Sequence, residues 1–217
     1  MAIETTAEFE QHRAPPESNG SRWVLLVAFA VFVSLGFLIV YSRFLEPVEQ
    51  TGVDHPGVGN QLSVLKVEPF IDADQSFTQA DLKGNVTLIN YWGPWCPPCR
   101  IEMPHMVEIE KKYHRHDQFQ FLSVTCGIWV YPSLEAMRIE TTRYRDQAKL
   151  DFPLYFDPDF TSRASLESAT GMEPQEMGYP TTVLIDQQGR IAGVWEGFST
   201  SLPDQIVASV DRLISQN

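Results

Sequence analysis

The stretch Trp92-Gly93-Pro94-Trp95-Cys96-Pro97-Pro98-Cys99 joins two segments of different periodicity. Before it, residues 86–91 form a nearly continuous β-prone run, which predicts a strand buried on both faces. After it, apolar residues recur at helical spacing from about Pro98 to His114, with basic residues near the expected C-terminal end. The sequence therefore predicts a Cys-x-x-Cys pair at the point where a buried strand ends and a helix begins.

This position gives the two cysteines different expected roles. A cysteine at a helix N-terminus faces unpaired backbone N–H groups and the positive end of the helix dipole, which stabilise the thiolate and lower its pKa. We therefore expect Cys96 to be the solvent-reachable nucleophile, and Cys99, one turn further on, to resolve the mixed disulfide that Cys96 forms. Pro97 and Pro98 lack N–H donors, which suits the first positions of a helix. The pair is predicted to be catalytic and to form a redox-active disulfide.

The pattern continues outward into a larger α/β arrangement. Residues 119–125 read as the next strand, and strand, helix and strand within about forty residues form a βαβ unit with parallel strands. Further elements are expected at residues 62–67 (strand), 133–149 (helix with Ser133 as N-cap), 152–156 (strand), 161–170 (helix ended by Gly171), 182–186 and 191–195 (a hairpin), and 203–214 (helix). The expected fold class is α/β, with a mixed central sheet flanked by helices.

The chain divides into four expected parts. Residues 1–22 are polar without apolar periodicity, which predicts a disordered N-terminal tail. Residues 23–41 carry no charge, and a helix of this length, at about 1.5 Å per residue, spans a bilayer core of about 30 Å. Residues 42–60 are rich in proline and glycine and are expected to be a linker, and residues 61–217 are expected to be the folded domain.

We expect the apolar segment to be an uncleaved transmembrane anchor rather than a secretory signal. It is longer than the usual apolar core of a signal, follows an acidic segment, and is followed by no small-residue cleavage site after Tyr41. Arg13 and Arg22 precede it and Arg43 follows it, a bias that places the N-terminus in the cytoplasm. The expected protein therefore crosses the lipid bilayer once, with its folded domain extracytoplasmic, on the periplasmic side.

The composition argues against some classes of function. The chain has 217 residues, of which 43% are hydrophobic and 20% charged, as expected for one globular domain with an appendage. Its net charge of −12 argues against nucleic acid as a partner, because phosphate binding needs a basic patch. A Cys-x-x-Cys pair is also half of a zinc site, but no second ligand pair follows, and His105, His114 and His116 are expected to be surface or helix-terminal residues. Neither a metal nor another cofactor is expected.

Three stretches together resemble a known family. Residues 81–86 (DLKGNV), 95–104 (WCPPCRIEMP) and 178–186 (GYPTTVLID), the last followed by Gly189-Arg190-Ile191, are similar to the thioredoxin superfamily and, within it, to the membrane-anchored TlpA/ResA/CcmG-like thiol-disulfide oxidoreductases. The resemblance spans about residues 67–198. It implies a thioredoxin-like fold with a TlpA-like central insertion. It also implies reduction of disulfides in extracytoplasmic proteins, with apocytochrome c as a typical client and a membrane redox protein as electron donor.

The resemblance also implies roles for individual residues. In that family the proline matching Pro180 is cis and packs against the cysteines, while the residue matching Tyr179 offers its backbone to an incoming substrate peptide. Glu102 matches an acidic helix residue of some members and, three residues after Cys99, lies on the face from which a carboxyl can move a proton during thiol exchange. Trp95 is expected to shield the site and to contact a partner.

Several assignments stay open. Glu102 also fits a first-turn glutamate that interacts only with the helix dipole. Cys126 is either a small core residue or a redox or regulatory thiol. Residues 127–132 and 171–177 form either a partner surface or ordinary loop packing. The alternative enzyme is a peroxiredoxin-like peroxidase, although Gly93 stands where that family has threonine or serine, and the alternative binding function is a metal-handling cytochrome-assembly protein.

Overall fold

The computed structural model describes residues 20–45 and 52–215, with side chains of the first helix described for residues 23–38. The chain divides after Pro47 into two compact units. The helices are α1 (Gly20–Leu45), α2 (Pro97–Tyr113), α3 (Leu134–Ala148), α4 (Thr161–Thr170) and α5 (Leu202–Ile214), with a 3-10 helix at Gln79–Leu82. The strands are β1 (Lys66–Ile71), β2 (Phe77–Thr78), β3 (Val86–Trp92), β4 (Phe119–Thr125), β5 (Leu154–Phe156), β6 (Thr181–Ile185) and β7 (Ile191–Glu196).

The N-terminal unit contains α1, whose 26 residues include the uncharged segment noted in the sequence. Within the described part of the chain, no helix is both long and apolar enough to cross a membrane. The expected anchor, residues 23–41, extends beyond the residues whose side chains are described, and it stays a prediction. Residues 1–19 of the expected tail and residues 46–51 of the expected linker lie outside the described residues.

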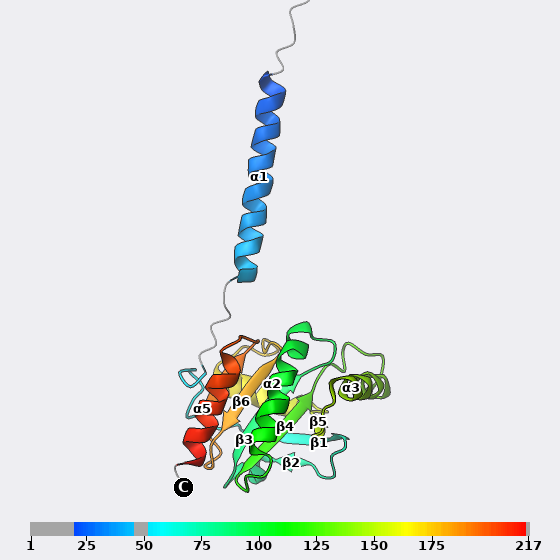
Figure 1. Ribbon diagram of the computed structural model, residues 1–217, viewed down its shortest axis with the longest axis vertical. Coiled ribbons are helices and arrows are strands. Elements are labelled where there is room, and N and C mark those ends of the chain that lie inside the picture. Colours follow the sequence, from blue (N-terminus) through cyan, green and yellow to red (C-terminus); the bar gives the residue numbers. More distant parts are fainter. Residues whose placement is uncertain (1–19, 46–51, 216–217) are drawn as a thin grey trace, which may run out of the picture. The chain divides into compact units, whose positions relative to one another are not determined.

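The described strands form one mixed sheet in the order β2-β1-β5-β4-β3-β6-β7 (Figure 1). As expected for a βαβ unit, β3 and β4 are parallel, and β5 continues this parallel set on the far side of β4. The hairpin of β6 and β7 is antiparallel and adds to the other side of β3. Every residue of β3 and of its neighbour β6 is buried, so the strand that leads to the cysteines lies in the enclosed centre of the sheet.

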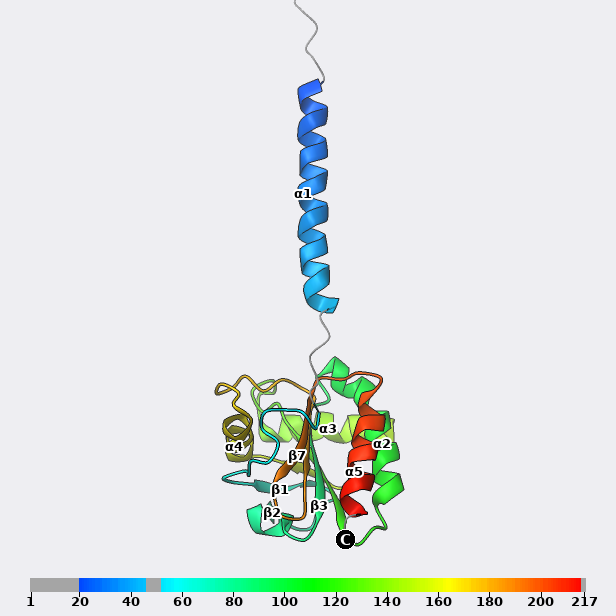
Figure 2. The ribbon, with the colours of Figure 1, turned by 90° about the vertical axis from the view of Figure 1, so that its left-hand side faces the viewer.

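Helices cover both faces of the sheet and divide the core in two. In Figure 2, α2 and α5 lie on one side of the strands and α4 on the other. One apolar cluster joins α2 and α5 to β3 and includes both cysteines of the pair. The second joins α4 to the opposite face and includes Cys126.

The strand expected at residues 62–67 is wrong in position, because β1 begins only at Lys66. Leu62 and Leu65 are buried, but Ser63 and Val64 between them bond to the Ser165 hydroxyl of α4, each at 3.0 Å. The backbone therefore follows α4 instead of pairing in the sheet. The short strand β2 and the 3-10 helix were not expected from the sequence.

Part of the segment expected to be a linker is attached to the domain. Gly52 forms an isolated antiparallel bridge with Val194 of β7, and the Gly59 N–H donates to the Ile191 carbonyl at 2.8 Å. The Asn60 side chain donates to the Ala169 carbonyl of α4. Residues 52–60 thus cover the open edge of β7, where unpaired backbone groups would otherwise face solvent.

Candidate active site

The two cysteines are joined in a disulfide at the junction of β3 and α2. Cys96 takes the N-cap position of α2, and the Cys99 backbone N–H donates to Cys96 Sγ at 3.3 Å. The S–S distance is 2.03 Å. Pro97 and Pro98 fill the first positions of the helix, where no N–H donor is required. The sequence analysis placed this strand-to-helix junction correctly.

The exposure of the two cysteines differs less than expected. In this oxidised state Cys96 is 3% exposed and Cys99 is fully buried. The order is the expected one, but Cys96 is not open to solvent, because Trp95 and Tyr179 pack against the same apolar cluster. A client disulfide must therefore approach this surface closely to reach the Cys96 sulfur.

The segment before β6 places a backbone carbonyl next to that sulfur. The Tyr179–Pro180 peptide bond is cis, as the family resemblance implies. The Tyr179 carbonyl oxygen lies 3.5 Å from Cys96 Sγ. The Thr181 hydroxyl donates to the Gly178 carbonyl at 2.9 Å, which closes the turn around the cis bond. The geometry suits binding of an extended peptide through its main chain beside the disulfide.

Trp95 is held by contacts on several sides. Its indole N–H donates to the Cys126 carbonyl at 2.9 Å, and its ring meets those of Tyr179 and Trp129 edge to face, with centroids 5.5 and 6.2 Å away. A Cβ added at Gly93 would lie 2.3 Å from the indole nitrogen, and one at Gly127, whose φ is +117°, would lie 2.1 Å away. Because only glycine leaves room here, position 93 is closed to the threonine or serine of a peroxiredoxin-like site.

Glu102 is a wholly buried carboxyl that faces the sheet. Its oxygens accept hydrogen bonds from the Asn90 amide at 2.9 Å and from the Thr182 hydroxyl at 3.3 Å. Burial raises the pKa of Glu102 to about 7, against the opposing effect of these two hydrogen bonds. Since α2 begins at Pro97 and has no acidic residue in its first turn, the alternative of a first-turn, dipole-only glutamate is wrong.

A pair of charged residues on α4 was missed by the sequence analysis. Arg163 donates through Nη1 to the Tyr179 hydroxyl and through Nε to the Glu167 carboxylate, both at 2.9 Å. The Glu167 carboxylate also accepts from the backbone N–H groups of Gln175 and Met177. Arg163 and Glu167 lie four residues apart, a spacing that is visible in the sequence, but this spacing is common on exposed helices and gives no sign of burial.

Cys126 is a free, buried thiol at the end of β4. Burial raises the pKa of Cys126 to about 12, so its sulfur stays protonated and unreactive at neutral pH. This environment agrees with the small core residue, one of the two alternatives drawn from the sequence. Its carbonyl nonetheless bonds Trp95, which links the third cysteine to the wall of the site.

The histidines that follow the cysteines make local contacts. The His105 ring stacks on Phe198, and His114 Nδ1 lies 2.9 Å from the Lys111 carbonyl at the end of α2. His116 Nδ1 accepts from the backbone of Gln118 at 3.3 Å. Among the described residues, no group of three or more His, Cys, Asp and Glu side chains is arranged to hold a metal ion.

Comparison with known proteins adds three findings. The chain is 30% identical over 120 residues to the thioredoxin-like protein YneN of Bacillus subtilis, which covers 55% of this chain and 61% of that protein. It is 29% identical to the thiol-disulfide oxidoreductase ResA of Halalkalibacterium halodurans, over 88% of this chain and 94% of that one. A solved structure of a secreted thiol-disulfide isomerase from Corynebacterium glutamicum matches with a TM-score of 0.53 and 26% identity, over 70% and 86% of the two chains.

The family assignment rests on a match to a family model. Solved structures with thioredoxin-like folds share this arrangement of sheet and helices, so the expected thioredoxin-like fold is confirmed. Residues 66–205 match the Redoxin family, a range that runs from β1 into α5 and includes the disulfide, Glu102 and the cis proline. The matched range is well over half of the sequence, and the chain therefore belongs to the Redoxin family.

Proposed function

We propose that the protein is a thiol-disulfide oxidoreductase that reduces disulfide bonds in extracytoplasmic proteins. The observation that carries this proposal is the Cys96–Cys99 disulfide at the N-terminus of α2, with the Tyr179 carbonyl 3.5 Å from the Cys96 sulfur. Thiol exchange with a polypeptide requires an activated thiol and a place for the peptide beside it. The helix N-terminus provides the first, and the Tyr179 carbonyl, as a backbone acceptor, provides the second.

The exchange runs in two steps from the reduced protein. The Cys96 thiolate attacks one sulfur of the client disulfide, which forms a mixed disulfide and releases the other client sulfur as a thiolate. Cys99, as a thiolate, then attacks the Cys96 sulfur, re-forms the Cys96–Cys99 bond and releases the first client sulfur. The client gains two electrons and, after protonation, two thiols, and the protein ends in the oxidised state with the disulfide described above.

Glu102 is the proposed proton carrier for the second step. Its pKa of about 7 lets the carboxyl hold or give up a proton near neutral pH, and it is buried three residues after Cys99 on the same helix. Trp95 and the Tyr179–Pro180 segment are the proposed client contacts, because both border the disulfide.

The proposed partners follow from the family resemblance and from the relatives. ResA is named a thiol-disulfide oxidoreductase, and the client we propose for this chain is a disulfide-bearing protein of the apocytochrome c type. A membrane redox protein would supply the two electrons that return the pair to dithiol. A single anchor at residues 23–41, with a cytoplasmic N-terminus, would hold the domain on the extracytoplasmic side, and the TlpA-like insertion would be the segment between β4 and β6 that carries α3, β5 and α4.

Thiol counting tests the proposal. Reduced full-length protein, mixed without oxygen with a disulfide-bearing protein, should lose two thiols for each client disulfide reduced, whereas Cys96→Ala should transfer none. A midpoint potential below about −220 mV in glutathione buffers would make the pair a reductant, and one near about −120 mV would make it an oxidant. Failure of the parent protein to exchange with any protein disulfide would contradict the proposed function.

A further inference from the structure

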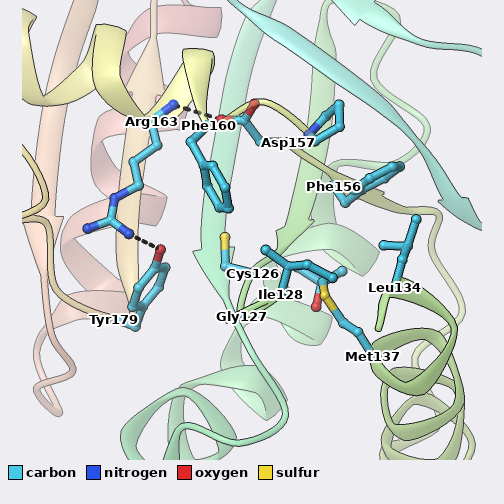
Figure 3. Close-up of a pocket in the computed structure, with 12 residues that line it drawn as sticks. Cys126, Gly127, Ile128, Leu134, Met137, Phe156, Asp157, Phe160, Arg163 and Tyr179 are labelled. Carbon is cyan, nitrogen blue, oxygen red and sulfur yellow. Dashed lines mark hydrogen bonds between the residues drawn. The ribbon is translucent and has the colours of Figure 1, made fainter. Parts of the chain in front are cut away.

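A small apolar cavity lies beside the disulfide site, between the end of β4, the start of α3 and the start of α4. Its volume is about 140 Å³. Figure 3 shows the side chains around it, most of which are apolar. The apolar ones include Cys126, Ile128, Leu134, Met137, Phe156 and Phe160. The disulfide exchange described above makes no use of this cavity.

The cavity adjoins the surface that a client must cross. Tyr179 lines the cavity with its side chain, while its carbonyl oxygen lies 3.5 Å from Cys96 Sγ. A larger groove of about 750 Å³ shares Phe160, Arg163 and Tyr179 with the cavity and extends to Trp95 and Trp129. A peptide bound along the Tyr179 backbone would therefore pass the cavity next to its attacked cysteine.

Most polar side chains of the wall have partners within the protein, and the two lining oxygens that lack one among the described residues, Asp157 Oδ1 and Thr125 Oγ1, are themselves buried. Arg163 binds the Tyr179 hydroxyl and Glu167, and Asp157 accepts from the Arg163 backbone N–H at the start of α4 (Figure 3). Because Arg163 is engaged in these bonds, it is not available to pair with an incoming carboxylate. An anionic group that entered would lose its water close to the Asp157 carboxylate, whereas an apolar group would meet the apolar side chains that make up most of the wall.

The volume of the cavity and the exposure of its rim limit which kind of side chain can enter it. An apolar protein cavity of about 150 Å³ is known to hold a benzene ring, so about 140 Å³ has room for the end of one aromatic or branched aliphatic side chain. Apolar side chains at the rim are unusually open, since Leu134 is 38%, Phe160 39% and Trp129 51% exposed. Exposed apolar residues gathered around an apolar cavity indicate a surface that another molecule covers.

We propose that this cavity binds one apolar side chain of the client, close in sequence to the cysteine that Cys96 attacks, and so selects clients by that residue. The proposal rests on the proposed function, since the occupant is the client of the same disulfide. It gives the segment between β4 and β6 a role in specificity, and it makes Leu134 and Phe160 specificity-determining residues outside the reactive pair.

Two disulfide-linked peptides that differ at one position test the proposal. Both carry the same disulfide, and the residue beside the attacked cysteine is phenylalanine in one and serine in the other. Full burial of a phenylalanine side chain strengthens binding about tenfold or more. The parent protein should therefore reduce the phenylalanine peptide with a kcat/KM at least about tenfold higher than that for the serine peptide. A general loss of activity lowers kcat/KM for both peptides alike, so it leaves the ratio of the two kcat/KM values unchanged.

Two matched variants on α3 test whether the preference for the phenylalanine peptide depends on the cavity. Leu134→Glu places a charge at the cavity, and a glutamate in the first turn of a helix is compatible with the helix dipole. It should bring the peptide ratio to within about twofold of one. Ile139→Glu makes the same change at a position on the same helix that is 51% exposed and does not line the cavity, and it should keep the parental ratio. Phe160→Ala, which removes one wall, should also lower the ratio.

The outcomes separate this proposal from the function on which it rests. If neither peptide is reduced by the parent protein, the proposed function is wrong. If both are reduced at equal rates, or if Leu134→Glu keeps the full preference, the cavity proposal is overturned while the function stands. A parent protein that self-associates through this face, and that Leu134→Glu separates, would make a second copy the occupant and would also overturn it.

Discussion

Replacing Glu102 by glutamine should remove a pH dependence of stability that the parent protein carries. Glutamine keeps the shape of the protonated carboxyl, and the Asn90 amide that donates to Glu102 also carries a buried Oδ1 acceptor without a hydrogen-bond partner among the described residues. The change therefore removes the titration of position 102 with little loss of packing.

The magnitude follows from the pKa of Glu102, which is about 7 in the folded protein and 4.5 for an ordinary glutamate. In this window the folded state holds a proton that the unfolded state has released, so raising the pH favours unfolding. The loss begins as the pH rises through about 4.5 and is complete above about 7. At about 1.4 kcal/mol per pH unit the whole effect is about 3 kcal/mol, of which about 2.5 kcal/mol falls between pH 5 and pH 8.5.

The assay is urea unfolding of the full chain in a non-ionic detergent, followed by tryptophan fluorescence at several pH values. Between pH 5 and pH 8.5 the parent should lose about 2.5 kcal/mol of unfolding free energy relative to Glu102→Gln, while Glu108→Gln, an exposed position on the same helix, should follow the parent. If the difference in unfolding free energy between the parent and Glu102→Gln changes by less than about 0.5 kcal/mol over this pH range, the reasoning is refuted.

Three further predictions concern other parts of the molecule. Cys126→Ser should still reduce protein disulfides, because the Cys96–Cys99 pair carries the exchange and burial keeps the Cys126 thiol protonated; loss of turnover in a variant with an unchanged circular dichroism spectrum would contradict this. Glu167→Ala should lower the free energy of unfolding by about 3 to 5 kcal/mol in urea titrations, since it leaves Arg163 buried without its carboxylate, and Glu167→Gln should recover part of the loss. A reporter fused after Asn217 should be active only if it functions outside the cytoplasm; activity of a cytoplasm-only reporter would reverse the proposed topology.

The fold was predictable where local signals coincide. Ser133 caps α3 and Gly171 ends α4 as expected, and β3, α2 and β4 fall within one residue of their expected bounds. In each case the periodicity of apolar residues and the residue at the boundary favour the same structure. The start of β1 was misplaced because Ser63 and Val64 bond to a serine about a hundred positions later, a contact that no local pattern carries.

The site was predictable only in part, for the same physical reason. The disulfide and its helix position follow from one continuous motif, and the cis bond before Pro180 follows from a family resemblance. The partner of Glu102 on β6, Thr182, lies 80 residues away, and the support of Tyr179 by Arg163 depends on how α4 packs against the following segment. Such contacts exist only after the sheet has formed, so the raised pKa of Glu102 could not be predicted from the sequence alone.

The most direct test of the thiol-exchange proposal is to trap its intermediate. Without the resolving sulfur, Cys99→Ala should form the mixed disulfide through Cys96 but should not release the client. Non-reducing gels of membranes from cells that produce Cys99→Ala should show covalent adducts that dithiothreitol removes, whereas Cys96→Ala should show few or none, because Cys99 is fully buried. Adducts that form only in Cys96→Ala would reverse the roles of the two cysteines, and their absence from both variants would contradict disulfide exchange as the activity of this protein.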